Sequence, residues 1–296
     1  MNYQFTREDV DFYSKGTRCS AWLYLPESDT PCPIIVMAHG LGGVREMWID
    51  RHAEHFAAAG YACFLFDYRN WGASDGKKRQ LINVKHQLVD WNNAIEFIKK
   101  DKRVDGNKLL IFGSSFSGGH AITLSVRRND IKSAVAQCPY TDQWATIKTI
   151  PPIRIIKFIP YLVGDLLSCL TGYHPVMLKL ADPQGKAALM AEPDYDKFIA
   201  RIPEKANFRN ETPARTILEF LKYSPSRYTK HVEIPIYVAA CLKDTLAPAY
   251  ATIKCMKRAK NATIKEYNCG HFDIYFDEFF EEAIADYIDF FNRTVK

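Results

Sequence analysis

Short apolar runs alternate with longer amphipathic segments through the first half of the chain. Each run is rich in Val, Ile, Ala or Phe, and the segment after it places apolar residues every three or four positions. The runs are typical of buried strands in a parallel sheet, and the segments are typical of the helices that cover such a sheet. The predicted strands span residues 33–38, 61–66, 108–112 and 131–137, and the predicted helices span residues 45–59, 84–100 and 118–127.

The two ends of the chain complete this pattern. Residues 1–30 alternate apolar and polar positions around a turn at Lys15 and Gly16, which favours antiparallel strands at one edge of the sheet. Near the other end, an apolar run over 234–240 predicts another buried strand, and residues 263–267 predict a further strand. The predicted fold class is therefore α/β, with a doubly wound, mostly parallel sheet and antiparallel strands at its N-terminal edge.

About 95 residues interrupt the alternation between Cys138 and Ile234, with several prolines, short helical runs and no evident strand. An excursion of this length predicts an inserted helical cap over residues 140–232, on a core formed by 1–139 and 233–296. A cap over the strand ends would set the choice of substrate.

The first part of the predicted cap, residues 150–170, is markedly apolar. Three interpretations are open: internal packing that also lines an apolar acyl pocket, contact with a membrane surface or partner, and a transmembrane helix. Arg154, Lys157, Asp165 and three prolines interrupt this segment, which argues against a span that crosses a bilayer.

Residues 111–119 place a serine at the apex of a small-residue turn between a predicted strand and a predicted helix. The G-x-S-x-G elbow of hydrolases has this form, because small neighbours two positions away accommodate the strained backbone of the nucleophile. Here Gly113 and Ser117 flank Ser115, so the second glycine of the pattern is a serine. The register of the strand favours Ser115 as nucleophile over Ser114 and Ser117. A serine-rich helix cap is the plainer alternative.

Partners for Ser115 follow in the order that this kind of site requires. Asp244 comes directly after the predicted strand 234–240, and His271 comes directly after the strand 263–267. Parallel strands end at one edge of a sheet, so the three side chains are predicted to meet there as nucleophile, acid and base. Asp142 and Asp273 are alternatives to Asp244.

A hydrolase of this kind also needs two backbone donors for the oxyanion that forms during acyl transfer. The Phe116 amide, which follows the nucleophile, is one candidate. The other is the Leu41 amide in the glycine-rich loop 39–43 after the strand 33–38. An ordinary glycine turn or a phosphate-binding loop is an alternative for residues 39–43, but the loop lacks the Lys-Ser/Thr of a P-loop and the G-x-G-x-x-G spacing.

Five segments together resemble the α/β-hydrolase superfamily: residues 39–43, 67–76, 113–120, 243–248 and 269–275. Within it, the chain is similar to a group related to dienelactone hydrolases and cocaine-esterase-like enzymes, which includes polyketide acyltransferases. Residues 182–190 and 208–215 resemble the cap of that group. The resemblance implies a Ser-Asp-His acyl-transfer site, and the serine at position 117 is usual for the group. It does not imply one substrate.

Composition excludes several other classes. The chain has 296 residues, of which 47% are hydrophobic and 25% charged, as in ordinary globular proteins. A net charge of +5 without a basic run gives no reason to expect nucleic acid as a partner. Eight irregularly spaced cysteines and the lack of a visible signal peptide predict a cytoplasmic protein with reduced thiols. His52 and His55 lack zincin spacing and are predicted to lie on a solvated helix face.

The predicted function is a serine hydrolase that acts on a carboxylic ester or thioester through an acyl-enzyme. The substrate would be a small molecule, without a cofactor or a metal, and assembly of identical chains is left open. An acyltransferase with the same triad is the first alternative, and a catalytically silent binding protein on the same scaffold is the second.

Overall fold

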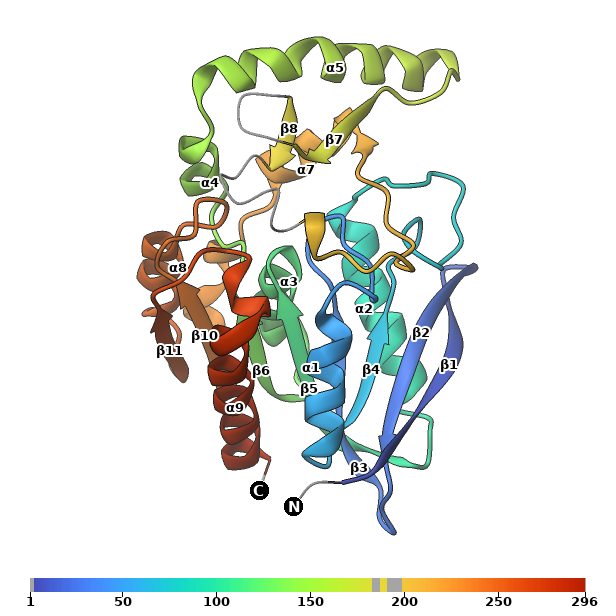
Figure 1. Ribbon diagram of the computed structural model, residues 1–296, viewed down its shortest axis with the longest axis vertical. Coiled ribbons are helices and arrows are strands. Elements are labelled where there is room, and N and C mark those ends of the chain that lie inside the picture. The colour runs from blue at the N-terminus through green and yellow to red at the C-terminus, as the bar shows by residue number, and fades with distance from the viewer. Residues whose placement is uncertain (1–2, 183–186, 191–198, 296) are drawn as a thin grey trace.

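The computed structural model describes residues 3–182, 187–190 and 199–295. A twisted sheet of eight strands forms the centre, in the order β1-β2-β4-β3-β5-β6-β10-β11 (Figure 1). Its strands are β1 (Phe5–Ser14), β2 (Thr17–Pro26), β3 (Cys32–Ala38), β4 (Ala62–Phe66), β5 (Val104–Ser114), β6 (Ile131–Gln137), β10 (Ile236–Cys241) and β11 (Ala262–Tyr267). The β1–β2 and β2–β4 pairs are antiparallel and all the other pairs are parallel. The predicted α/β fold with an antiparallel N-terminal edge is confirmed.

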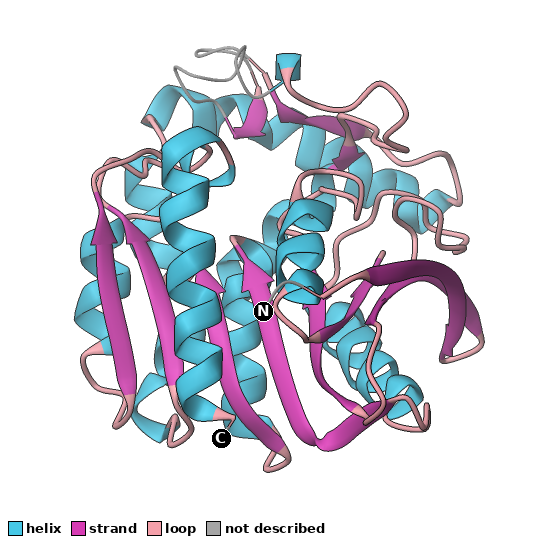
Figure 2. Cartoon of the chain, turned by 60° about the horizontal axis from the view of Figure 1, so that its bottom comes forward, coloured by secondary structure: helices cyan, strands magenta, loops and turns pink. Residues whose placement is uncertain are grey.

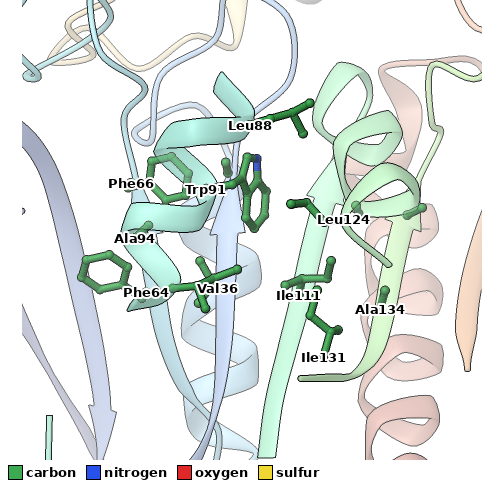
Figure 3. Close-up of a cluster of buried hydrophobic side chains, with 14 of the residues drawn as sticks. Val36, Phe64, Phe66, Leu88, Trp91, Ala94, Ile111, Leu124, Ile131 and Ala134 are labelled. Carbon is green, nitrogen blue, oxygen red and sulfur yellow. The ribbon is translucent and has the colours of Figure 1, made fainter. Parts of the chain in front are cut away.

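Helices cover both faces of this sheet (Figure 2). They are α1 (Ile49–Ala58), α2 (Val84–Ile98), α3 (Phe116–Arg127), α8 (Ala249–Met256) and α9 (Asp277–Thr294). One apolar cluster joins the sheet to α2, α3 and α8, and another joins it to α1 and α9. Alternate residues of β3 belong to opposite clusters, because a central strand buries both of its faces. Figure 3 shows the first cluster, where Trp91 of α2 lies near Val36 and Ile111 of the sheet.

The described part of the segment that is predicted to form a cap lies above the carboxyl ends of the parallel strands (Figure 1). It contains α4 (Gln143–Thr149), α5 (Pro152–Thr171), β7 (Met177–Ala181), β8 (Ala188–Met190), β9 (Thr212–Pro213) and α7 (Ile217–Lys222). The sequence showed no evident strand in this segment, but three short strands form a small sheet there in the order β8-β7-β9. Strands of two to five residues are too short to show an alternating pattern. Residues 183–186 of the cap segment noted in the sequence lie outside the described residues.

The helix α5 crosses the top of the molecule (Figure 1). Pro152 occupies its first turn, and Gly172 ends it with φ 76°, a left-handed conformation that glycine adopts without strain. The carboxylate of Asp165, which is fully buried, accepts hydrogen bonds from the Arg215 guanidinium at 2.9 and 3.1 Å and from the backbone amides of Arg215 and Val176. These bonds tie α5 to both ends of the β7–β9 region. Within the described ranges, no helix combines the length and the apolar character needed to span a bilayer.

Candidate active site

Ser115 occupies a strained turn between β5 and α3. Its φ of 56° and ψ of −117° lie outside the regions that side-chain-bearing residues favour. The turn is held by the Ser115 amide, which donates to Gln137 O at 2.8 Å, and by the Tyr140 amide, which donates to Ser115 O at 2.9 Å. A Cβ on Gly113 would lie 2.1 Å from the carbonyl oxygen of Ser117, so only glycine fits at the start of this turn.

A chain of hydrogen bonds joins Ser115, His271 and Asp244. The Nε2 atom of His271 lies 3.0 Å from Ser115 Oγ, and its Nδ1 atom lies 2.6 Å from Asp244 Oδ2. The other carboxylate oxygen of Asp244 accepts from the backbone amides of Leu246 and Ala247 at 2.8 and 2.7 Å. Because a carboxylate can only accept, Nδ1 of His271 carries a proton and Nε2 is left to accept from the serine hydroxyl. The three residues that the sequence singled out therefore meet.

Electrostatics stabilise the positive charge that His271 acquires when it takes up a second proton. Burial alone would lower the pKa of this imidazole, but the attraction of the Asp244 carboxylate and contact with the Cys138 sulfur outweigh burial. The pKa of His271 is thus held well above its ordinary value. An imidazole in this setting is a stronger base toward a neighbouring hydroxyl than one in water.

The residues considered as alternatives to Ser115 and Asp244 have other hydrogen-bond partners. Ser114 Oγ lies 2.5 Å from Tyr275 Oη and accepts from Gln137 Nε2 at 3.0 Å. Asp142 caps α4 by accepting from two backbone amides, and Asp273 accepts from the Gly270 amide at 2.8 Å. These contacts account for each of them without His271.

The loop 39–43 lies directly against Ser115. A Cβ on Gly40 would lie 2.8 Å from Ser115 Cβ, so this close approach requires glycine. Leu41 and Ser115 line the same two pockets, and Phe116 lines one of them. As the first residue of α3, Phe116 has an amide without an acceptor inside the helix.

Ser117, which replaces the second glycine of the elbow pattern, ties this loop to α3. Its hydroxyl donates to His39 O at 2.6 Å and also contacts Tyr68 Oη. Tyr68 in turn accepts from the indole of Trp91 at 2.7 Å. This buried network could not be predicted from the sequence, because its members come from four distant segments.

Behind the loop, Asp67 supports the backbone on both sides. It is fully buried and accepts from the amides of Arg45 and Ala73 at 2.8 and 3.1 Å. Burial raises the pKa of this carboxyl, although the Arg45 charge and these amides oppose the rise. Burial also lowers the pKa of the nearby His39 to about 4, so this imidazole is neutral near pH 7. A Cβ on Gly72 would lie 2.3 Å from the Asp67 carboxylate, which explains a glycine in this turn.

Two small pockets flank the serine. One, of about 40 Å³, is lined by residues that include Trp48, Phe272 and Tyr275. The other, of about 50 Å³, extends beneath the cap, where Tyr140 and Phe220 line it. Ser115 and His271 line both pockets, so a bound molecule could extend from the serine in two directions.

Among the described residues, one group of side chains could ligate a metal ion: Cys138, Asp244 and His271, whose ligand atoms lie within 4.8 Å of one another. An ion there would take the Nδ1 atom that now donates to Asp244. A metal at this place and the Ser115–His271–Asp244 chain therefore exclude each other.

The expectation of a solvated face for His52 and His55 was wrong for His52. This residue is completely buried, and its ring nitrogens lie 3.1 Å from Trp48 O and 3.0 Å from Gln137 Oε1. Its neighbours in the sequence are mostly polar, so the pattern did not indicate that this side of α1 packs against α9 and the sheet.

The fold and the geometry at Ser115 define an enzyme of the α/β-hydrolase class, as the sequence resemblance implied. Residues 29–278 match the family described as "Serine aminopeptidase, S33", and the chain belongs to this family of serine hydrolases.

Comparison with known proteins adds relatives with several names. The chain is 40% identical over 288 residues to the "Quorum-quenching protein AidA" of Acinetobacter baumannii, covering 97% of this chain and 95% of that one. It is 25% identical over 302 residues to the "Polyketide transferase ATR5" of Stachybotrys chlorohalonatus, covering 98% of each. The crystal structure of the α/β hydrolase GrgF from Penicillium sp. sh18 superposes with a TM-score of 0.83 at 22% identity, over 98% of this chain and 99% of that chain.

Proposed function

We propose that the protein hydrolyses a carboxylic ester or thioester through an acyl-enzyme formed on Ser115. The observation that carries this proposal is the pair of contacts on His271, 3.0 Å from the serine oxygen and 2.6 Å from the Asp244 carboxylate. Ser115 is the nucleophile, His271 the general base, and Asp244 the group that orients the imidazole and stabilises its positive charge.

In the first half of the reaction, Ser115 Oγ attacks the carbonyl carbon while His271 Nε2 takes the hydroxyl proton. The amides of Leu41 and Phe116 donate to the oxyanion of the tetrahedral intermediate. The intermediate then collapses, the bond to the leaving oxygen or sulfur breaks, and His271 returns the proton to the leaving group. In the second half, His271 removes a proton from water, whose oxygen attacks the acyl carbon. The bond from this carbon to Ser115 Oγ then breaks, His271 returns the proton to Oγ, and a carboxylic acid is released.

The position of the loop beside Ser115 supports the assignment of the oxyanion donors. Gly40 packs on the Cβ of Ser115, and the Ser117 hydroxyl holds His39 O at 2.6 Å, so the loop bearing Leu41 is fixed beside the serine. Donors that are fixed before the reaction cost no reorganisation when the negative charge develops.

An acyltransferase is the second candidate. A relative named polyketide transferase aligns along nearly the whole chain, which favours it. It would share every step up to the acyl-serine, and an alcohol would then replace water as the second nucleophile. Incubation of the enzyme with an activated ester and a series of alcohols, followed by analysis for new esters, separates the two functions.

The test of the proposed function uses a fluorescent fluorophosphonate and p-nitrophenyl butyrate. We expect the wild-type protein to be labelled, and Ser115→Ala to lose the label and to lose kcat by about 10⁴-fold to 10⁶-fold. Ser114→Ala is the matched control, because its hydroxyl lies next in sequence but bonds to Tyr275. This control should keep the label. Labelling of Ser115→Ala at the wild-type level would refute the proposal.

A further inference from the structure

The pocket on the cap side of Ser115 continues into a larger cavity beneath α5. This cavity has a volume of about 230 Å³ and lies between α4, α5, α7 and β8. Four residues line both spaces: Tyr140, Thr146, Leu189 and Phe220. The two spaces therefore adjoin, one beside Ser115 and the other beneath α5.

The lining of the cavity is almost entirely hydrocarbon. Of its twelve described lining residues, only Tyr140 and Thr146 carry a polar side-chain atom, and none carries a charge. The Tyr140 hydroxyl already donates to Phe220 O at 3.1 Å. Water needs two or more polar partners in a cavity and would find few here, so the cavity suits an apolar group.

Phe158 and Leu162 of α5 and Ile217 of α7 line this cavity but not the pocket beside Ser115, and we call the part they line the far end of the cavity. An apolar cavity of about 150 Å³ accepts benzene, which has six carbons. By simple proportion, 230 Å³ holds a chain of roughly nine carbons. The pocket beside Ser115 adds space for the first atoms after the carbonyl group.

We propose that this cavity is the acyl-chain site of the enzyme and that its substrates carry an unbranched aliphatic acyl group of medium length, roughly eight to twelve carbons. This inference rests on the proposed function, because the chain must start at the carbonyl attacked by Ser115. The opposite pocket, lined by Trp48, Phe272 and Tyr275, then receives the leaving group.

The test measures kcat/KM with p-nitrophenyl esters from acetate to palmitate. For the wild-type enzyme we expect kcat/KM to rise about fourfold for each added methylene group up to about ten carbons, which corresponds to burial of hydrocarbon, and then to level off or fall. A preference for acetate, or no dependence on chain length, would overturn the acyl-chain site.

Variants that fill the far end test the location. We expect Ile217→Trp and Leu162→Trp each to lower kcat/KM for the decanoate ester at least tenfold and to change it less than twofold for the acetate ester. The control is Leu170→Trp, on the same helix but 84% exposed and outside the lining, and it should leave both values unchanged. Equal effects on both esters, or none on decanoate, would place the chain elsewhere. If the larger side chains prevent folding, Ile217→Ala and Leu162→Ala should instead move the optimum to longer esters.

Failure of this inference differs from failure of the proposed function. Ser115-dependent acetate hydrolysis without chain-length selection would leave the hydrolase standing and remove the acyl-chain site. If no ester were turned over and Ser115 were not labelled, calorimetric titration with decanoate would still test the cavity. Binding that Ile217→Trp abolishes would support an aliphatic ligand there, and no binding would refute it.

Discussion

The helices α9 and α5 are similar in length but orient their side chains in opposite ways. In α9, Phe280, Ile284 and Phe291 are buried against the sheet, while Glu278 and Glu281 face solvent. In α5, the inward side includes the polar residues Arg154, Asp165 and Ser168, and the outward side is apolar. The exposed apolar residues of this outward side are Ile153, Ile156, Tyr161, Val163, Leu166, Leu167 and Leu170, whereas the exposed Ile155 and Ile159 line the cavity beneath the helix.

This difference indicates two ways of attaching a helix. Burial of large apolar side chains fixes α9, and removal of hydrocarbon from water supplies the free energy. In α5, polar contacts of Asp165 with Arg215 and Val176 act together with a small apolar cluster around Phe158. We therefore expect the core to be sensitive to loss of volume, and the cap to be sensitive to loss of charge.

The core also carries the Ser115–His271–Asp244 chain, so a change there should act on all substrates alike. We expect Asp244→Asn to lower kcat by about 10⁴-fold, because the imidazole loses the partner that fixes its tautomer. Parallel assays of acetate and decanoate esters measure this. A loss confined to one ester would contradict an assignment of Asp244 to the core chemistry.

The pH dependence of kcat/KM also tests the role of Asp244. A protonated His271 cannot take the serine proton, so kcat/KM should fall as the pH drops through its pKa. Since that pKa is raised, the fall should begin above the ordinary value of about 6.5. Asp244→Asn removes the carboxylate that raises it, so the midpoint should move to lower pH. An unchanged midpoint would show that Asp244 does not control this titration.

Removal of a large side chain from the core should lower the free energy of unfolding strongly. We expect Phe280→Ala to lower the free energy of unfolding by about 3 to 5 kcal/mol, because this ring is completely buried between α9, α1 and the sheet. Urea denaturation measures the change. A loss below 1 kcal/mol would mean that α9 is not held by packing, and the contrast with α5 would fail.

Loss of a charge in the cap should have a smaller and more local effect. We expect Asp165→Ala to destabilise the attachment of α5 by about 2 to 3 kcal/mol, since it leaves the Arg215 charge without its buried partner. This loss of free energy is smaller than the loss expected on breaking a fully buried ion pair, because the Arg215 side chain is 21% exposed. Limited proteolysis should cleave the cap faster, while the core unfolds at nearly the wild-type urea concentration. Equal protection of the cap in both proteins would contradict this prediction.

The smallest effect is expected on the outer side of α5. Leu167 and Leu170 are 57% and 84% exposed. We expect Leu167→Gln and Leu170→Gln each to change the free energy of unfolding by less than about 0.5 kcal/mol, because little packing is lost. Thermal unfolding beside Phe280→Ala gives the comparison directly. A large loss at either leucine would show that this side is packed in the folded protein.

The sequence predicted best what depends on local pattern. Ser115, Asp244 and His271 each follow a strand, which for Ser115 and Asp244 ends in a continuous apolar run. The carboxyl ends of neighbouring strands in a parallel sheet lie at the same edge. The short strands of the cap were missed because two to five residues give no periodic signal. The contacts of His52, Tyr68 and the Asp165–Arg215 pair were missed for another reason: each joins segments that only the folded chain brings together.

The bond from Ser117 to His39 O affects how this enzyme can be altered. It connects the loop bearing the Leu41 amide to the helix that begins with the Phe116 amide, so the two amides move together. A change in α4, α5 or α7 can reshape the space for a substrate without reaching this link. If the cavity beneath α5 holds the acyl chain as proposed, selectivity and reactivity are carried by separate parts of the molecule, and selection in the laboratory can act on the first while the second stays constant.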